Sequence, residues 1–432
     1  MFRSLHTHNY RLFAAGQVVS NTGSWMQRVA QDWLVLNLSH NSGTALGIVT
    51  ALQFVPTLAL GLWGGVVADR YDKRRLLMGT QLCAGLTALT LGVLDLTGAV
   101  QIWHVFVLAA ALGLVTVVDN PTRQSFAVEM VGRADVGNAV SLNSAIFNSA
   151  RIVGPAVAGL LISTVGTGQV FLINGASYLA VISSLALMRE SELHKARPLP
   201  RASGQLREGL AYVRSRRDLM LPLLLVFVVA TLGLNFQITI ALMAKSTFHT
   251  GAESYGLLST AIAVGSLGGA LVSSRRSVRP RLRLLLGAAF AFGLLETTSA
   301  LMPTYLLFAI VLMPTGLAAL LFTTAANSSM QIGAGPRMRG RVMALYLLAF
   351  MGGAPFGSFF IGWLAQATSP RASIALGGLA SMGAAVVLGL ALARREGITV
   401  EPRPSPLPHL HLLIPDESSL AHPAPFRLPR QW

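Results

Sequence analysis

The chain has 432 residues, of which 53% are hydrophobic and only 12% are charged, and its mean hydropathy is +0.59. A soluble domain usually carries about 25% charged residues, so this composition excludes an ordinary soluble protein and indicates an integral membrane protein. A single cysteine excludes an internal disulfide framework. The net charge of +16 would be consistent with nucleic-acid binding. The distribution of the basic residues along the chain indicates instead that this charge sets the membrane topology.

Twelve apolar stretches are each long enough to cross a bilayer, which takes about 20 residues in a helix. Lipid offers the backbone no hydrogen bonds and no alternating strand pattern is visible, so these stretches are predicted to be helices. Their predicted bounds are 12–38, 43–67, 76–97, 100–121, 138–165, 168–188, 219–243, 253–273, 284–302, 304–326, 341–367 and 372–393. The predicted fold class is an all-α membrane protein with twelve transmembrane helices.

The basic residues predict the topology of these spans. With the N-terminus in the cytoplasm, all but four of the 33 Lys and Arg fall on the cytoplasmic side. The four exceptions are Lys245 and Arg371 in outer loops, and Arg28 and Arg151 within spans. We therefore expect a multi-pass protein of the plasma or inner membrane with both termini in the cytoplasm. Its positive charge faces the anionic inner leaflet, and no nucleic-acid partner is expected.

The two halves of the chain share a pattern of glycines. Gly132, Gly137, Gly154 and Gly159 recur at one constant spacing as Gly335, Gly340, Gly357 and Gly362. A duplicated six-helix unit implies two bundles related by an axis along the membrane normal, with substrate bound between them near the midplane. The predicted domains are an N-terminal six-helix bundle at 1–189, a cytoplasmic linker with an amphipathic helix at 190–218, a C-terminal six-helix bundle at 219–394 and a disordered cytoplasmic tail at 395–432.

The linker contains the stretch GQLREGLAYVRSRRDL, residues 204–219. Leu206, Leu210 and Val213 fall on one helical face, with arginines on the others, which predicts a short amphipathic helix on the inner leaflet. An ordinary basic linker is the alternative. The tail is rich in proline, which predicts disorder, and the pair His409 and His411 within it is not enough to indicate a metal site.

The loop between spans two and three reads GGVVADRYDKRRLL, residues 64–77. It resembles the signature loop of the major facilitator superfamily, Gly-x-x-x-Asp-Arg-x-Gly-Arg-Arg. The matching positions are Gly65, Asp69, Arg70, Lys73 and Arg74. Asp72 stands where the pattern has its second glycine, so the sequence does not decide the conformation of this turn.

The resemblance implies a conformational latch at this loop. Asp69 would cap the positive N-terminus of span eleven, near Arg339. The basic residues would pair with acids at the cytoplasmic end of span four, where Asp119 and Glu129 are available. The alternative is a plain basic loop. The corresponding position in the second half is Ser273, which looks like a degraded copy.

Span five contains ARIVGPAVAG, residues 150–159. It resembles the superfamily's export-associated motif, Gly-x-x-x-Gly-Pro-x-x-Gly-Gly, in Gly154, Pro155 and Gly159, with alanine at two of the glycine positions. In the superfamily this motif marks antiporters, and it implies tight packing of spans five and eight with a bend at the proline. Ordinary packing of small residues is the alternative.

Three further stretches resemble one branch of the superfamily, which contains bacterial siderophore exporters and macrolide efflux proteins. They are GSWMQRVAQDWLVL at 23–36, VDNPTRQSF at 118–126 and NSSMQIGAGPRMRGRVMALY at 327–346. The resemblance implies a transporter with a small-molecule substrate, protons and the bilayer as partners, acting as a monomer without a cofactor or metal. No enzymatic activity is expected. None of the three lysines follows a glycine, so no ATP-binding Walker motif is present.

Polar side chains inside the spans predict the transport pathway, because polar groups at membrane depth face protein or water. Span one places Gln17, Asn21, Ser24, Arg28 and Gln31 on one helical face, and Asp32 lies one turn from Arg28. Span five adds Asn148 and Arg151, and span seven adds a weaker stripe of Thr231, Asn235 and Thr239. The predicted substrate and proton pathway is Gln17, Asn21, Arg28, Gln31, Asp32, Asn148, Arg151 and Asn235.

Each charged candidate has two interpretations. Arg28 and Asp32 could form a static pair that fixes helix packing, or Asp32 could carry the transported proton. Arg151 could bind an anionic substrate or brace span five. Glu296 in span nine is another protonatable candidate. Together these features predict a proton antiporter that exports drug-like, macrolide or siderophore-like molecules by rocker-switch alternating access, with a proton-coupled uptake symporter or facilitator as the alternative.

Overall fold

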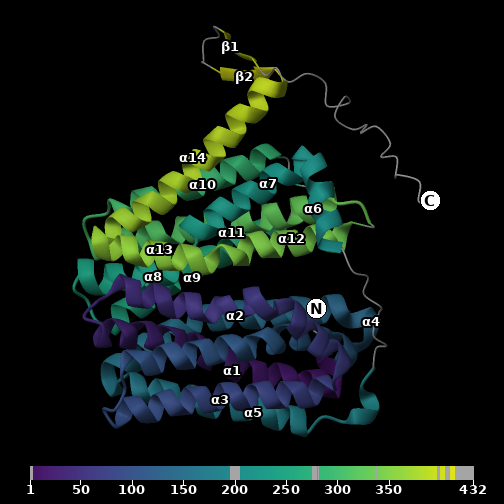
Figure 1. The fold of residues 1–432 in the computed structure, drawn as a ribbon, viewed down its shortest axis with the longest axis vertical. Coiled ribbons are helices and arrows are strands. Elements are labelled where there is room, and N and C mark those ends of the chain that lie inside the picture. The colour runs from purple at the N-terminus through teal and green to yellow at the C-terminus, as the bar shows by residue number, and fades with distance from the viewer. Residues whose placement is uncertain are drawn as a thin grey trace.

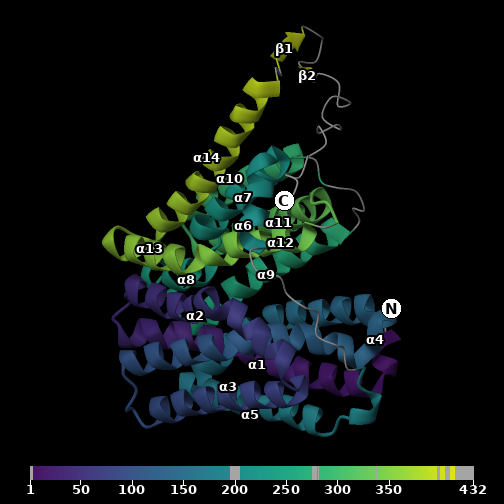
Figure 2. The ribbon, with the colours of Figure 1, turned by 45° about the vertical axis from the view of Figure 1, so that its right-hand side comes forward.

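The computed structural model describes residues 3–194, 205–274, 280, 282–336, 338–396, 399–403 and 409–413. The middle of the linker, most of the basic loop after span eight, Arg337 and the rest of the tail lie outside these ranges. The helices run roughly side by side, with those of the first half of the chain gathered below those of the second half (Figure 1). When the molecule is rotated by 45° about the vertical axis, the same two groups of helices are again seen one below the other (Figure 2).

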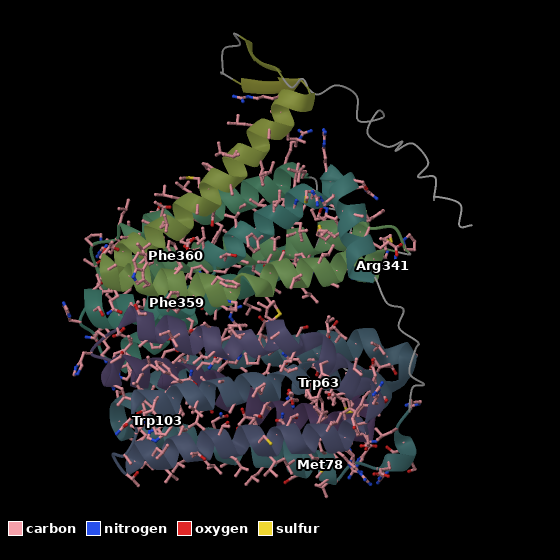
Figure 3. All side chains as sticks on the ribbon, viewed as in Figure 1. Trp63, Met78, Trp103, Arg341, Phe359 and Phe360 are labelled. Carbon is pink, nitrogen blue, oxygen red and sulfur yellow. The ribbon has the colours of Figure 1, made fainter. Side chains whose placement is uncertain are left out.

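The helices of the first half are α1 (His8–Leu38), α2 (Gly43–Arg70), α3 (Lys73–Leu96), α4 (Ile102–Val165) and α5 (Thr167–Ala186), with short 3₁₀ turns at Arg3–His6 and Glu190–Glu192. The second half comprises α6 (Gln205–Ser215), α7 (Arg217–Val228), η3 (Val229–Gly233), α8 (Phe236–Leu242), η4 (Met243–Thr247), α9 (Ala252–Ser274), α10 (Leu282–Ala300), α11 (Tyr305–Gly333), α12 (Arg339–Gly352), α13 (Ala354–Ala367) and α14 (Pro370–Glu396). Large apolar side chains such as Trp63, Trp103 and Phe360 are exposed on these helices (Figure 3), as expected for lipid-facing surfaces.

Eleven helical segments of the described residues are long and apolar enough to cross a membrane. α1 is not among them, although its 31 residues are long enough, because its polar face lowers its hydropathy. α4 supplies two spans that meet at Gly132, whose φ of 71° is left-handed. Glycine adopts this conformation without a steric penalty, so the chain can kink here between two helices.

The span predicted at 219–243 is broken near its middle. α7 ends at Val228, η3 is a π-helical turn, and α8 begins at Phe236. Between them Leu234 and Asn235 have ψ values of 34° and 35°, which are not helical. π-helical turns are frequent at functional sites, and a break of this kind rotates the side chains beyond it relative to a continuous helix.

The two halves contact each other closely at one end of the molecule, which we name the Ser42 end. Ser42 donates a hydrogen bond to Gln366 Oε1 at 2.6 Å. α13 packs against α2 there, and a Cβ on Gly362 would lie only 2.2 Å from the carbonyl oxygen of Gly43. Glycine at this position therefore lets the two backbones approach to a distance that any side chain would prevent.

The linker forms a helix, α6, at the opposite end of the molecule, which we name the basic end (Figure 1). Val213 is fully buried whereas Leu210 is exposed, and the side chain of Leu206 lies outside the described residues. Glu208 forms an ion pair with Arg341 of α12, labelled in Figure 3. α6 thus rests on the second half of the chain through Val213, through the ion pair of Glu208, and through the Tyr212 hydroxyl, which accepts from the Gly335 amide at 3.4 Å.

The tail contains two short strands. β1 (Thr399–Arg403) pairs with β2 (His409–Leu413) in antiparallel register, with Thr399 opposite Leu413. The proline content predicts disorder throughout this segment, so these two strands differ from that expectation.

Candidate substrate and proton site

A cavity of about 220 Å³ lies where the two halves of the chain meet. α1 and α4 form one wall, and the break after η3, α8 and α9 form the other. The lining residues are Trp25, Arg28, Val29, Asp32, Arg151, Pro155, Leu234, Phe236, Gln237, Ile240, Tyr255, Ser259 and Ile262. Three of the predicted pathway residues, Arg28, Asp32 and Arg151, therefore share one cavity.

Asp32 joins the two halves across this cavity. Its side chain is fully buried. Tyr255 of α9 donates a hydrogen bond from its hydroxyl to Asp32 Oδ2 at 2.7 Å, and Gln237 of α8 donates from Nε2 to Oδ1 at 3.0 Å. Bonds from neutral donors to a carboxylate are stronger than bonds between neutral groups, so this side chain is a polar link between α1 and the second half.

The predicted ion pair between Arg28 and Asp32 is not formed among the described residues. Spacing of one helical turn brings the two side chains within reach, but the Asp32 oxygens accept from the opposite half. Arg28 is exposed to the cavity, and its guanidinium carbon lies 4.7 Å from the centroid of the Trp25 ring. A cation over an indole is the most favourable of the cation–π pairs.

Arg151 approaches the same tryptophan from α4. Its guanidinium carbon lies 5.9 Å from the centroid of the Trp25 ring, and Phe147 packs edge-on to that ring with centroids 5.6 Å apart. Within the described part of the chain, Arg151 has no hydrogen bond to Asp32 or to a backbone carbonyl that would brace span five. Two arginines thus share one aromatic ring at the wall of the cavity.

The export-like motif of span five lies beside these residues. A Cβ on Gly154 would lie 2.5 Å from Trp25 Cβ, so this glycine makes room for the tryptophan. Pro155 lines the cavity. Gly159 packs against α9, where an added Cβ would lie 2.8 Å from the Ala252 carbonyl oxygen. The predicted close packing of spans five and eight is present at Gly159, and the antiporter role of the motif stays a prediction.

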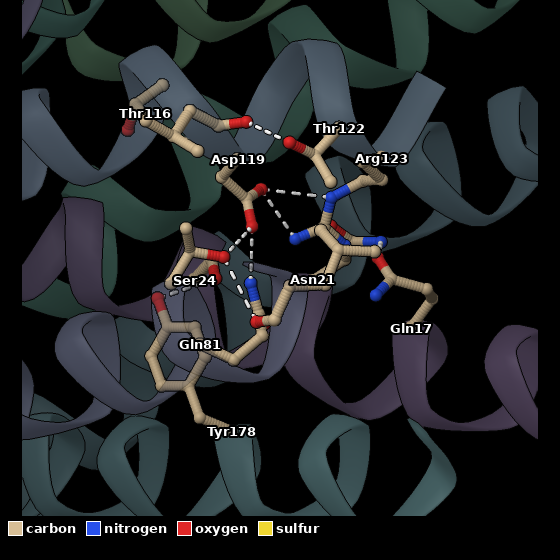
Figure 4. A network of polar contacts seen from close by, with 12 residues as sticks. Gln17, Asn21, Ser24, Gln81, Thr116, Asp119, Thr122, Arg123 and Tyr178 are labelled. Atoms are coloured by element: carbon tan, nitrogen blue, oxygen red, sulfur yellow. Dashed lines mark hydrogen bonds and ion pairs between the residues drawn. The ribbon is translucent and has the colours of Figure 1, made fainter. Parts of the chain in front are cut away.

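Gln17 and Asn21 lie outside the cavity, in a polar network shown in Figure 4. Gln17 accepts hydrogen bonds from Arg123 and from Asn21. Arg123 in turn donates to Asp119 Oδ2, at 2.7 Å from its Nη2. α1 is 31 residues long, so its polar face extends beyond the cavity and packs there against α4. The spacing of polar residues in the sequence does not show which of them line the cavity and which pack against α4.

Three other predicted pathway residues do not line the cavity either. Gln31 is buried on α1. The side-chain amides of Asn148 and Asn235 donate to carbonyl oxygens one turn earlier in their own segments, those of Ser144 and Thr231, each at 2.8 Å. Asparagine side chains in helices often form such hydrogen bonds with the nearby backbone.

Sequence reasoning missed most of the wall supplied by the second half. The stripe of Thr231, Asn235 and Thr239 assumes a continuous helix, but the break at Leu234 changes the register and turns Gln237 into the cavity. α9 carries several hydroxyls, among them Ser259, which also lines the cavity, so the sequence did not single out Tyr255. Trp25 could have been found, because it lies three residues before Arg28, the spacing of helical neighbours.

The signature loop makes its described contacts within the first half of the chain. Lys73 pairs with Glu129 at 2.6 Å, as the sequence predicts. Arg74 donates to the Leu185 carbonyl oxygen at 2.6 Å. Asp72 caps α3 by accepting from the Arg75 amide at 2.9 Å, which explains how the loop turns without its second glycine.

Asp119, the other predicted partner of the signature loop, bonds elsewhere. Its oxygens accept from Arg123 and from Thr80 and Gln81 of α3, both at 2.8 Å (Figure 4). The prediction that Asp119 pairs with the loop is therefore wrong in this structure. The contact of Asp69 with span eleven stays a prediction.

Glu296 is buried in α10 away from the cavity wall, with 2% of its surface exposed. Its Oε2 has no hydrogen-bond partner among the described residues. A Cβ on Gly233 would lie 3.1 Å from Oε2, which places the carboxyl beside the end of η3. Within the ranges that the structure describes, no group of three or more His, Cys, Asp or Glu side chains could hold a metal ion.

Long apolar helices and a buried carboxylate at a cavity between two halves define a membrane transporter as the class of protein. Comparisons with known proteins agree with this class. Residues 1–418 match the family model described as "Transmembrane secretion effector". The chain therefore belongs to the transmembrane secretion effector family of the major facilitator superfamily.

Relatives with sequence similarity are named as transporters or efflux proteins. The chain is 30% identical to the multidrug efflux pump Tap of Mycolicibacterium fortuitum, over 84% of this chain and 90% of the relative. It is 28% identical to the staphyloferrin A transporter of Staphylococcus aureus, over 58% of this chain and only 63% of that relative. Macrolide efflux protein A of Streptococcus pyogenes is 22% identical, over 77% and 83% of the two chains.

Solved structures of membrane transporters share the fold. A bacterial homologue of the human lysosomal transporter Spinster, described as inward-facing and unoccupied, superposes with a TM-score of 0.66 at 16% sequence identity. The superposition covers 89% of this chain and 96% of that structure. At this identity the likeness supports the fold alone.

Proposed function

We propose that the protein exports small organic molecules from the cytoplasm by proton antiport, through rocker-switch alternating access of the cavity. Its relatives include a multidrug efflux pump and a macrolide efflux protein, and the antiporter-like motif lies against the cavity. We place the protein in the plasma or inner membrane with both termini in the cytoplasm, from the distribution of its basic residues. We expect it to act as a monomer.

We further propose that α1 is the twelfth span and that the helices form two six-helix bundles. A helix of 31 residues is about 46 Å long, more than the hydrocarbon core requires. Equivalent contacts made by the two halves of the chain support the proposal of two bundles. Gly159 of span five packs against α9 of the other half, and its counterpart Gly362 of span eleven packs against α2.

The bridging position of Asp32 is the observation that carries the proposal. An ionised carboxylate accepts both hydrogen bonds from the second half. A proton on one oxygen makes that oxygen a donor and removes the charge that strengthens both bonds. Proton binding therefore weakens the link between α1 and the second half, which is what coupling of protonation to bundle movement requires.

In the proposed cycle, a proton entering from outside neutralises Asp32 and promotes release of substrate, and proton release to the cytoplasm resets the site. The close contacts at the Ser42 end would keep the outer side closed while the cavity is open to the cytoplasm. The signature loop would act as the latch for the opposite state, with Asp69 capping span eleven.

Inside-out membrane vesicles that are acidified by respiration test the direction of transport. Antiport predicts that a radiolabelled macrolide or siderophore accumulates inside the vesicles, and that nigericin, which collapses the pH gradient, abolishes the accumulation. Loss of preloaded compound driven by the same gradient would identify an uptake symporter. Movement that ignores the gradient would identify a facilitator.

A further inference from the structure

Two arginines of the cavity have no acidic partner. Among the described residues, neither Arg28 nor Arg151 forms an ion pair, and both lie against Trp25. The nearest acid on the wall, Asp32, has its oxygens engaged by Tyr255 and Gln237. Arg28 interacts with Asp32 only through longer-range charge attraction, and cations without a contacting acid at membrane depth are costly and mark substrate or ion pathways.

The arrangement around these arginines is specific about the chemistry of that ligand. A guanidinium presents a planar fork of donors that matches a carboxylate in two parallel hydrogen bonds. The opposite wall has an apolar part, formed by Phe236, Ile240 and Ile262, beside the polar side chains Gln237, Tyr255 and Ser259. The cavity thus combines a cationic side with an apolar side, within a volume of about 220 Å³.

We propose that the cavity selects organic anions, with the substrate's carboxylate held between Arg28 and Arg151 and its apolar body against Phe236 and Ile240. This inference rests on the proposed function, since it takes the cavity as the substrate site. Trp25 has a positioning role, because its ring holds both guanidiniums at the wall. Asp32 forms no ion pair with either arginine, so substrate and proton would bind at separate side chains.

Binding of a matched pair of probes to the purified protein tests this proposal. 1-Naphthoate and 1-naphthamide have nearly the same size and shape and differ in charge. We expect 1-naphthoate to bind at least about tenfold more tightly, the difference that one charge-assisted contact provides. Equilibrium dialysis in lipid nanodiscs measures both affinities without requiring transport.

Variants of the two arginines sharpen the test. Arg28→Gln and Arg151→Gln should each weaken 1-naphthoate by about tenfold and leave 1-naphthamide unchanged. Arg28→Lys, which keeps the charge without the fork, should lose less. Arg123→Gln removes an arginine of α4 outside the cavity and is the matched control, because it should leave the ratio of the two affinities unchanged.

Equal affinities for the two probes, a preference for the amide or no binding of either would overturn the anion proposal. A charge preference that persists in both glutamine variants would also overturn it. None of these results depends on a pH gradient, so proton-driven accumulation in vesicles could still succeed. Conversely, selective binding of 1-naphthoate without gradient-driven transport would refute the antiport mechanism and leave the anion site standing.

Discussion

Two of the carboxylates buried in the helical body, Asp32 and Glu296, differ in their surroundings. Asp32 accepts hydrogen bonds from two residues of the opposite half, whereas Glu296 has an oxygen without a partner among the described residues and lies beside Gly233. A buried charge without a partner is strongly unfavourable, whereas a bonded one is tolerated. Burial alone therefore does not mark a proton carrier. The contacts of a carboxylate with the opposite half of the chain distinguish Asp32 from Glu296.

The largest expected effect is that of Asp32→Asn. Asparagine keeps the size of the side chain and cannot take up or release the proton, so proton-driven efflux should fall by roughly 100-fold or more, while expression and ligand binding remain measurable. Transport by vesicles and binding by purified protein check the two halves of this prediction. Efflux at the level of the unmodified protein would contradict the role of Asp32.

Tyr255→Phe tests whether the hydrogen bond between Asp32 and the second half is needed for turnover. The change removes the hydroxyl that donates to Asp32 Oδ2 and keeps the ring, and a bond to a charged group contributes about 1.5–3 kcal/mol. We expect turnover to fall by about tenfold with proton coupling retained. The control is Tyr305→Phe, which removes a hydroxyl that donates to the Ser254 carbonyl oxygen. Equal effects of the two changes would argue for a general loss of stability.

Asp69→Asn tests an acid at the basic end, away from the cavity that Asp32 lines. If Asp69 caps span eleven in one conformation, the loss of its charge should cost about 0.3–1 kcal/mol, or about two- to fivefold in turnover. Substrate affinity should change less than turnover. Rates and affinities measured on the same vesicles separate the two, and an unchanged turnover would support a plain basic loop.

Glu296→Gln should have the smallest effect on transport. Glutamine is close to a protonated glutamate in size and removes the chance of an uncompensated charge, so efflux should stay within about twofold of the unmodified protein. A large loss of proton-driven efflux would move the proton site to Glu296 and reverse the comparison with Asp32.

Much of the fold follows from patterns that the sequence carries openly. Apolar length predicts the spans, and Gly132 divides α4 within the loop expected between spans four and five. The polar face of α1 kept that helix out of a count based on hydropathy, although its arginine and aspartate predicted a cavity-facing role. The site was half predicted, because Arg28, Asp32 and Arg151 line the cavity.

The rest of the site could not be predicted because it depends on tertiary contacts. Periodicity identifies a polar face but not its neighbour, so Gln17 of α1 was assigned to the cavity although it packs against Arg123. The π-helical turn before Leu234 has no clear composition signal, and it decides that Gln237 enters the cavity. Likewise, no spacing rule indicated that Tyr255 would reach Asp32.

In the proposed cycle, Asp32 exchanges its proton as the protein binds substrate. Purified protein in a weakly buffered solution, monitored with a pH indicator, measures this directly when the exported compound is added. We predict that the unmodified protein and Glu296→Gln release a proton on binding, whereas Asp32→Asn binds the compound and releases none. Equal proton release by Asp32→Asn would show that another group exchanges the proton.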